Sequence, residues 1–318
     1  MRLFVALISV LLISLSSPAF ASERALRVVD LTGEFDRFAM TTTRMPDAQR
    51  IAAFEHRIGP MADGFYDRER RPDQYDERVL TTLRSYPGER TRILDVGRRF
   101  NVQFAAARRS FEAVFGPVST ERPVYLIDSL GELDGGTREL NGKNTLVFGA
   151  DVIADVHRGR DMVPFFHHEL FHLYQEKHLT RCAAVWCALW EEGLATYAAG
   201  RLDPGADDHA LILDLPEPIR PTVDADRARA VCAVTQLLDS TSDEDYGALF
   251  LGDRQLEGFP SRMGYYIGYL VARDIGRTHD IREMATMGFV EARPLIDAAL
   301  KRMAACPSTQ QAVTREGA

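Results

Sequence analysis

The amino-acid sequence predicts an α+β protein, with a small antiparallel sheet between an N-terminal helical region and a mostly helical C-terminal half. Apolar residues at three- and four-residue spacing in DAQRIAAFEHRI (47–58) and RILDVGRRFNVQFAAARRSFEAVFG (92–116) predict two helices. The short, β-branched and apolar stretches PVYLIDS (123–129) and NTLVFGADVIA (144–154) predict strands. The segment between them, GELDGGTRELNGKN, is rich in turn residues.

The remaining segments follow the same pattern of helices and exposed connections. FYDRERRPDQYDER (65–78) is highly charged and contains proline, so we expect a surface connection there. Helical periodicity returns from Pro164 to Gly200, in two pieces that are interrupted near HLTRC. Three further helices are expected, over residues 222–239, 262–276 and 292–304.

The N-terminus has the layout of a secretory signal peptide. One arginine precedes an apolar run from Leu3 to about Leu15, and an A-x-A pattern ends at Ala21. The alternative is an uncleaved membrane anchor, but the run is shorter than the ~20 residues that span a bilayer. We therefore expect a signal peptide over residues 1–21, a periplasmic or secreted bacterial protein, and no membrane span after cleavage.

Charge and cysteine content narrow the possible functions. The chain has 38 basic and 46 acidic residues, a net charge of −8, which argues against a nucleic acid partner. Four cysteines in an exported protein predict two disulfides, but the sequence leaves all three pairings open. Cys182 and Cys187 can pair only if a loop separates them. Zinc-thiolate ligation is disfavoured because their spacing is not CxxC.

The stretch PFFHHELFHLYQEKH (164–178) carries four of the eight histidines and contains an HExxH motif. His168 and His172 are four residues apart, so on a helix both imidazoles can reach one ion. Glu169 is rotated by about 100° and lies beside that ion, where it can take a proton from a water molecule. Zinc lowers the pKa of such a water to about 7, so a carboxylate suffices as the base.

A catalytic zinc site needs a third protein ligand, and the sequence offers two positions for it. His178 has the spacing of the third histidine in HExxHxxGxxH, but Gln175 stands where that motif has its glycine. If the helix continues, His178 lies about 15 Å from the first ligand. The other position is in EEGLATY, twenty residues after His172, where a second helix can return Glu192 to the ion. Spacing alone does not exclude Glu191.

Two motifs resemble known metallopeptidases. EGLA (192–195) after HExxH resembles the gluzincin metallopeptidases, and this resemblance makes Glu192 the third ligand. GYYIGY (264–269), with HHELFH and EEGLATY, is similar to a group of largely uncharacterised bacterial proteins described as predicted zinc-dependent proteases. The resemblance implies Zn²⁺ as cofactor and a thermolysin-like (gluzincin) catalytic core. Gly193 costs roughly 1 kcal/mol against alanine in a helix, so we expect the two metal-bearing helices to approach closely there.

The resemblance covers roughly residues 90–305. We therefore expect a signal peptide (1–21), an N-terminal helical region (22–89), a zinc metallopeptidase-like domain (90–305) and a flexible tail (306–318).

Hydrolysis builds negative charge on the former carbonyl oxygen, which a hydroxyl or guanidinium can stabilise. Tyr265 is the first candidate for this role. Arg262, three residues earlier on the same predicted helix face, and Tyr266 are the second candidates. Tyrosines and glycines at helical spacing are also typical of a helix face that only packs against neighbouring elements.

Further residues complete the predicted site. We expect the strand 144–150 to be an edge strand that pairs with extended substrate. Thr196 is a candidate acceptor for the second nitrogen of a ligating histidine. His167 faces away from the motif and is expected to be an ordinary hydrogen-bonded helix residue.

The sequence thus predicts an exported zinc-dependent metallohydrolase, a peptidase acting on a peptide or protein substrate. Glu169 is the expected general base and Tyr265 the expected oxyanion donor. The alternatives are an inactive zinc-binding or interaction protein on the same scaffold, and a zinc amidase or esterase.

Overall fold

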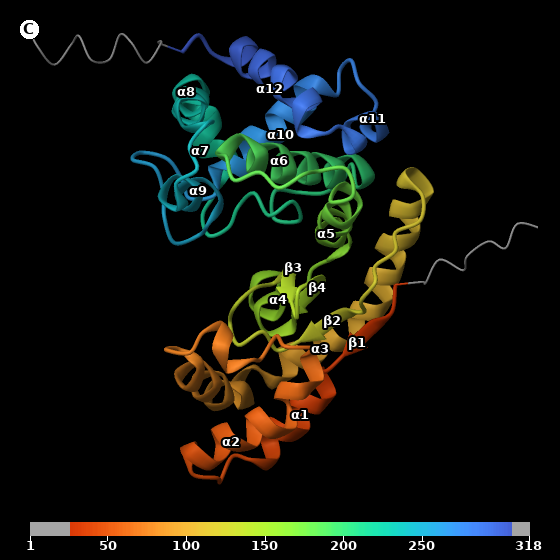
Figure 1. Cartoon of the computed structure of the whole chain (residues 1–318), viewed down its shortest axis with the longest axis vertical. Coiled ribbons are helices and arrows are strands. Elements are labelled where there is room, and N and C mark those ends of the chain that lie inside the picture. Colours follow the sequence, from red (N-terminus) through yellow and green to blue (C-terminus); the bar gives the residue numbers. More distant parts are fainter. Residues whose placement is uncertain (1–25, 307–318) are drawn as a thin grey trace, which may run out of the picture.

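The computed structural model describes residues 26–306 and confirms an α+β fold that is mostly helical, with one four-stranded sheet. Figure 1 shows the N-terminal helices at one end, the sheet in the middle and the C-terminal helices at the other end. The predicted signal peptide and residues 307–318 of the predicted tail lie outside the described residues.

The N-terminal region contains one strand as well as helices. Its elements are β1 (Val28–Asp30), α1 (Thr32–Thr41), α2 (Asp47–Arg57), the short 3-10 helices η1 (Gly59–Ala62) and η2 (Arg68–Arg70), and α3 (Tyr75–Phe115). The expected helices at 47–58 and 92–116 are α2 and part of α3. The charged connection at 65–78 contains η2 and the start of α3.

The expected boundary between residues 89 and 90 falls inside α3, a continuous 41-residue helix. Pro87 lacks an N–H, which leaves the carbonyl of Leu83 without its usual helical donor. The guanidinium of Arg50, from α2, donates to this Leu83 oxygen at 3.0 Å. The helix therefore continues through the proline, and α3 spans both regions.

The sheet is mixed, which corrects the prediction of an antiparallel sheet. Its strands β2 (Val124–Ile127), β3 (Gly135–Leu140) and β4 (Lys143–Gly149) join β1 in the order β1-β2-β4-β3. β1 and β4 both run parallel to β2, and only β3 and β4 are antiparallel. β4 is apolar and buried over most of its length, so it takes the interior position that favours a strand covered on both faces.

This strand order also corrects the expected edge strand. Residues 144–150 lie in β4 and the start of the next helix, and β4 is paired on both sides. The two edge strands are β1 and β3, and β3 lies in the segment where the sequence indicated only turns. The prediction failed because strand order depends on long-range pairing that local residue patterns do not encode.

An aromatic cluster fixes the HExxH helix to the sheet. Phe100 and Phe104 of α3, Phe148 of β4 and Phe166 of α5 (Val163–Gln175) meet at the centre of the molecule. The ring of Phe166 lies 5.0 Å from Phe100 and 5.4 Å from Phe104. Because each buried aromatic contact adds about 0.5–1.5 kcal/mol beyond its burial, this packing holds α5 rigidly.

The C-terminal half is helical, as predicted. Besides α5, it contains α4 (Ala150–Val156), α6 (Val185–Leu202), α7 (Ile219–Ala225), α8 (Arg227–Leu237), α9 (Asp243–Phe250), α10 (Met263–Ile275), α11 (Ile281–Thr286) and α12 (Phe289–Met303). The expected helix at 222–239 is divided into α7 and α8, and the sequence did not predict α9 or α11. The end of the expected strand 144–154 is α4.

Two disulfides connect the helices of this half. Cys182, in the loop that precedes α6, is joined to Cys187 in the first turn of that helix, so the two are not on one continuous helix, as a pairing at this spacing requires. Cys232 of α8 is joined to Cys306, which follows α12. The first residue of the predicted tail is therefore covalently attached to the helical half.

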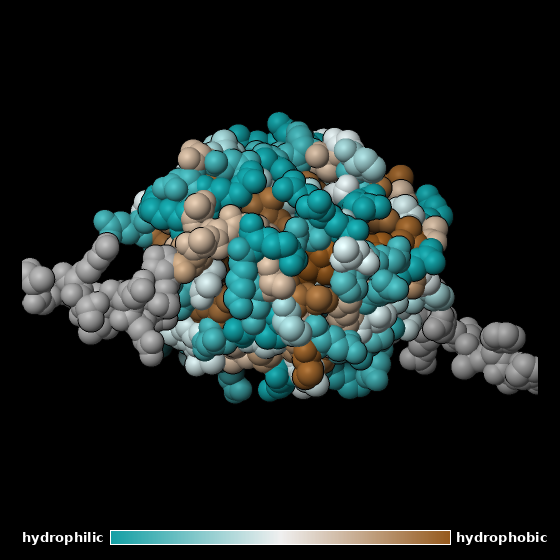
Figure 2. Space-filling view, turned by 90° about the horizontal axis from the view of Figure 1, so that it is seen from above, coloured by the Kyte–Doolittle hydropathy of each residue, from teal (hydrophilic) through white to brown (hydrophobic). Residues whose placement is uncertain are grey.

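The face seen along the long axis in Figure 2 carries mostly hydrophilic residues, with hydrophobic residues between them. Among the residues described, no helix combines the length and apolarity needed to cross a membrane.

Candidate metal centre

Three side chains from two helices converge on one point. His168 and His172 extend from successive turns of α5, and Glu192 comes from α6. The Nε2 atoms of His168 and His172 are 3.0 Å apart. Glu192 Oε2 lies 3.2 Å from His168 Nε2 and 3.3 Å from His172 Nε2. The three potential donor atoms thus form a nearly equilateral triangle.

This triangle has the dimensions of a metal site. In a tetrahedral zinc centre with bonds of about 2.0–2.1 Å, neighbouring ligand atoms lie about 3.3 Å apart. Two imidazole nitrogens and one carboxylate oxygen are also a ligand set that zinc enzymes use while leaving a fourth position open. This group could hold a metal ion.

The geometry distinguishes between the proposed third ligands. Glu192 belongs to the group, whereas Glu191 and His178 do not. α5 ends at Gln175, although glutamine favours helix and its presence suggested that the helix continues. The turn that follows carries His178 against the ring of Tyr174, with 5.7 Å between ring centroids.

Burial and the charges of neighbouring ligands shift the pKa of each side chain in the triangle. Burial acts to lower the pKa of His172, but Glu192 outweighs it and raises this pKa to about 9. Burial acts to raise the pKa of Glu192, and the two histidines hold it far below its usual range. Burial lowers the pKa of His168. Because a ligating imidazole is neutral, metal binding to this triangle would release any proton that His172 carries.

Glu169 lies beside the triangle and is almost fully buried, with 6% of its surface exposed. Burial raises the pKa of its carboxyl to about 8, and the positive charge of His172 opposes this shift. It follows His168 on α5 and lies outside the ligand group.

Tyr265 and Arg262 reach the same centre from the start of α10. The Tyr265 ring stacks beside the His168 ring, with 6.2 Å between centroids and 29° between planes. Burial raises the pKa of Tyr265 well above its usual value, and Glu192 adds to the shift. The Arg262 guanidinium carbon lies 4.6 Å from the Tyr265 ring centroid.

Tyr266 is directed elsewhere, which corrects its selection as an oxyanion candidate. Its hydroxyl donates to the carboxylate of Asp224 on α7, at 3.0 and 3.1 Å from the two oxygens. Neighbouring residues on a helix point about 100° apart, so Tyr265 and Tyr266 cannot both face the metal centre.

Two residues near the ligands have the environments that the sequence suggested. The hydroxyl of Thr196 donates to Glu192 O at 2.8 Å, and its oxygen lies 3.5 Å from His168 Nδ1. His167 is hydrogen-bonded away from the centre, through Nδ1 to Asp203 and through Nε2 to Ser110.

Sequence reasoning missed two polar side chains near the centre. Tyr246 of α9 is close enough to Glu192 and Glu191 for their charges to act on it: burial raises its pKa to about 12, and both carboxylates add to the shift. The charge of Arg138, on β3, acts in the opposite direction on both Tyr246 and Glu169. GGTREL (135–140) shows no alternation of apolar and polar residues, so no local signal marks the strand that carries Arg138.

Comparison of the chain with protein-family models, with curated proteins and with solved structures found no match. The class of protein is therefore argued from the site itself.

Proposed function

We propose that this protein is a zinc-dependent metallohydrolase that acts as a peptidase. The observation that carries the proposal is the triangle of His168, His172 and Glu192 with the Glu169 carboxylate beside it. A purely structural site does not need that additional buried carboxylate. Its presence supports hydrolysis over metal storage.

His168, His172 and Glu192 would hold the ion. When bound, zinc supplies a Lewis acid that lowers the pKa of water to about 7 and polarises a substrate carbonyl. Glu169 takes the proton from the attacking water and can pass it to the leaving amine. The Tyr265 hydroxyl and the Arg262 guanidinium stabilise the negative charge that develops on the carbonyl oxygen.

The edge of the sheet supports a peptide substrate. β3 is paired only with β4 within the described chain, so its outer edge is free to pair with an extended peptide. β3 also begins directly against the HExxH helix: a Cβ on Gly135 would lie 2.5 Å from Phe165 Cζ. A peptide added to β3 would therefore run close to the ligands.

We further propose a thermolysin-like, gluzincin-type core and export through the N-terminal signal peptide. Support for the core comes from the order of its parts, namely an edge strand, the HExxH helix α5, and a following helix that returns the glutamate ligand.

The proposal is tested with Glu169→Gln in the mature protein. Zinc-loaded wild type should cleave members of a mixed peptide library, followed by mass spectrometry. Glu169→Gln should keep its zinc and lose about 10²–10⁴-fold in kcat, because the general base is absent. Glu176→Gln, which alters an exposed carboxylate just after α5, is the matched control and should retain activity. Full activity in Glu169→Gln would refute the proposed role of this residue.

A further inference from the structure

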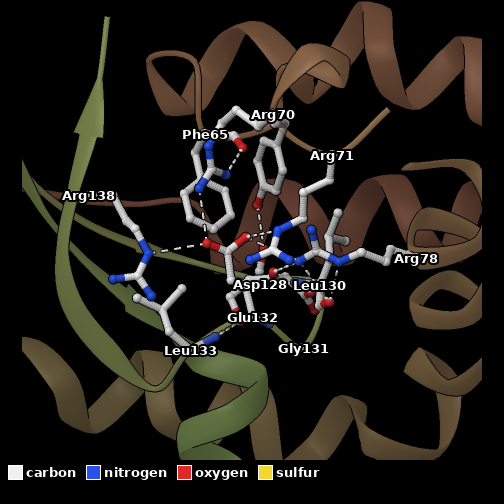
Figure 3. Close-up of polar contacts among 12 residues, drawn as sticks. Phe65, Arg70, Arg71, Arg78, Asp128, Leu130, Gly131, Glu132, Leu133 and Arg138 are labelled. Carbon is white, nitrogen blue, oxygen red and sulfur yellow. Dashed lines mark hydrogen bonds and ion pairs between the residues drawn. The ribbon is translucent and has the colours of Figure 1, made fainter. Parts of the chain in front are cut away.

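Four guanidinium groups surround one buried carboxylate between the N-terminal region and the sheet (Figure 3). The carboxylate belongs to Glu132, whose side chain is only 3% exposed. The arginine cluster consists of Arg70, Arg71, Arg78 and Arg138, each of which forms an ion pair with Glu132 at 3.0–3.4 Å.

The arginine cluster has an excess of positive charge. Within the described part of the chain, none of its four arginines forms an ion pair with any other carboxylate. Four guanidiniums on one carboxylate leave three positive charges without a partner. Such crowding raises the local positive potential and favours the binding of a further anion.

Two of the four arginines have structural tasks. Arg78 donates to the backbone oxygens of Ser129 and Leu130, and its side chain is 20% exposed. Arg70 donates to the Phe65 oxygen at 2.6 Å and packs over the Phe65 ring. The Arg78 contacts fix the loop between β2 and β3, and the Arg70 contacts fix its guanidinium against Phe65.

The other two arginines retain donors. The side chain of Arg71 is 46% exposed and makes no hydrogen bond among the residues described, although its Nε lies 3.4 Å from Glu132. Arg138 is 34% exposed; its Nε and Nη1 donate to Glu132 and to the Thr137 oxygen, and its Nη2 has no acceptor in residues 26–306. Both can donate to an incoming carboxylate while remaining in place.

Arg138 lies on the strand that a peptide substrate would join. It is on β3, which begins against α5 at Gly135. Alternation along the strand turns the Arg138 side chain to the opposite face of the sheet from that contact, where its charge acts on Tyr246. A peptide paired with the outer edge of β3 would therefore pass Arg138.

We propose that Arg138, assisted by Arg71, binds a carboxylate of the substrate, so that the metal centre acts on acidic peptides. The inference rests on the proposed peptidase function and adds the substrate class to it. Guanidinium groups suit this role because their planar array of donors matches a carboxylate.

The test compares matched peptides with zinc-loaded full-length mature protein. Each pair of N-acetylated, C-amidated peptides differs only by Glu or Gln at one position near the cleaved bond. We expect kcat/KM to be about 10- to 100-fold higher for the Glu peptide, as a charge-assisted hydrogen bond implies. Arg138→Ala should abolish this preference with little change for the Gln peptide, and Arg138→Lys should keep part of it.

Two controls accompany these variants. Arg138→Ala leaves three arginines around Glu132 and should fold like the wild type. Arg181→Ala removes a 99% exposed arginine that lies 3.7 Å from Glu139 on the same strand, and should retain the preference. A Gln peptide with a free C-terminus, compared with its amide, shows whether the bound carboxylate is a side chain or the chain end.

The outcomes separate this inference from the proposed function. If wild type cleaves Glu, Gln and free-acid peptides equally well, the acidic specificity is wrong and the peptidase function remains. If it cleaves none, the peptidase function fails, and binding is measured by fluorescence anisotropy with labelled Glu-Ala and Gln-Ala repeat peptides. If the wild type binds the Glu-Ala repeat more tightly and Arg138→Ala abolishes this difference, the result supports an acidic-peptide site. Equal binding of the two repeats overturns it.

Discussion

Gly193 on α6 and Gly268 on α10 are in direct backbone contact. A Cβ atom on Gly193 would lie 2.2 Å from the carbonyl carbon of Gly268, and one on Gly268 would lie 2.4 Å from the Leu189 oxygen. The contact joins the EGLA motif to the GYYIGY motif. It brings Tyr265, one turn before Gly268, to the His168 ring. The sequence had suggested that Gly193 meets the HExxH helix, whereas its partner is α10.

Gly193→Ala should therefore destabilise the protein and weaken metal binding. The methyl group meets backbone atoms that cannot rotate away, so α6 and α10 must separate. Overpacking of this kind costs about 1–3 kcal/mol, and sometimes more. Chemical unfolding and metal content are the measurements. Gly88→Ala, at an exposed position in α3 where a Cβ meets nothing within 4 Å, is the control and should stabilise by about 0.5–1 kcal/mol.

Tyr265→Phe should reduce kcat by about 10²–10³-fold with little change in metal content, because it removes one donor to the developing negative charge. Peptide hydrolysis under saturating substrate is the measurement. Tyr266→Phe is the matched control: it loses a hydrogen bond to Asp224 on the other side of α10 and should affect stability rather than kcat. Equal losses of kcat in both variants would contradict the assigned role.

Glu132→Gln should destabilise the protein by about 3–5 kcal/mol at pH 7, since the four arginines lose the one carboxylate that pairs with them within residues 26–306. Burial acts to raise the pKa of Glu132, but Arg70 and the other arginines lower it overall. Its stabilising contribution is thus complete above the unfolded-state pKa of about 4.3 and disappears as the pH falls through the lower folded-state value.

The difference between wild type and Glu132→Gln should accordingly be largest at pH 7 and shrink toward pH 3. Urea unfolding at both pH values measures it. Glu121→Gln, whose side chain is 82% exposed, should change stability by no more than about 1 kcal/mol. A Glu132→Gln effect that is the same at pH 7 and pH 3 would show that charge is not the cause.

The metal triangle was predictable because its parts are local. HExxH places two imidazoles on one helix face through helical geometry alone, and EGLA follows after a loop that is long enough to reverse the chain. The periodicity of α2, α3, α5, α6 and α10 is similarly local, so those helices were predicted.

The features that were missed depend on contacts between distant segments. β1 joins the sheet through parallel pairing with β2, almost 100 residues later in the chain. This strand order places β3 at an edge of the sheet. The position of Arg138 at that edge therefore depends on the order as well. The arginines of the cluster come from η2, α3 and β3, and no spacing pattern in the sequence predicts that they meet. Tyr266 was wrongly selected because its side chain points about 100° away from that of Tyr265 and its hydroxyl bonds to Asp224.

The central claim is that His168, His172 and Glu192 hold a zinc ion. The most direct measurement is the zinc content of purified residues 22–318, beside Glu192→Gln and Glu191→Gln. We predict about one zinc per wild-type chain, a similar content in Glu191→Gln and a large loss in Glu192→Gln. A wild-type protein that contains no zinc and takes up none, or a loss of zinc only in Glu191→Gln, would show that these three residues do not form the site.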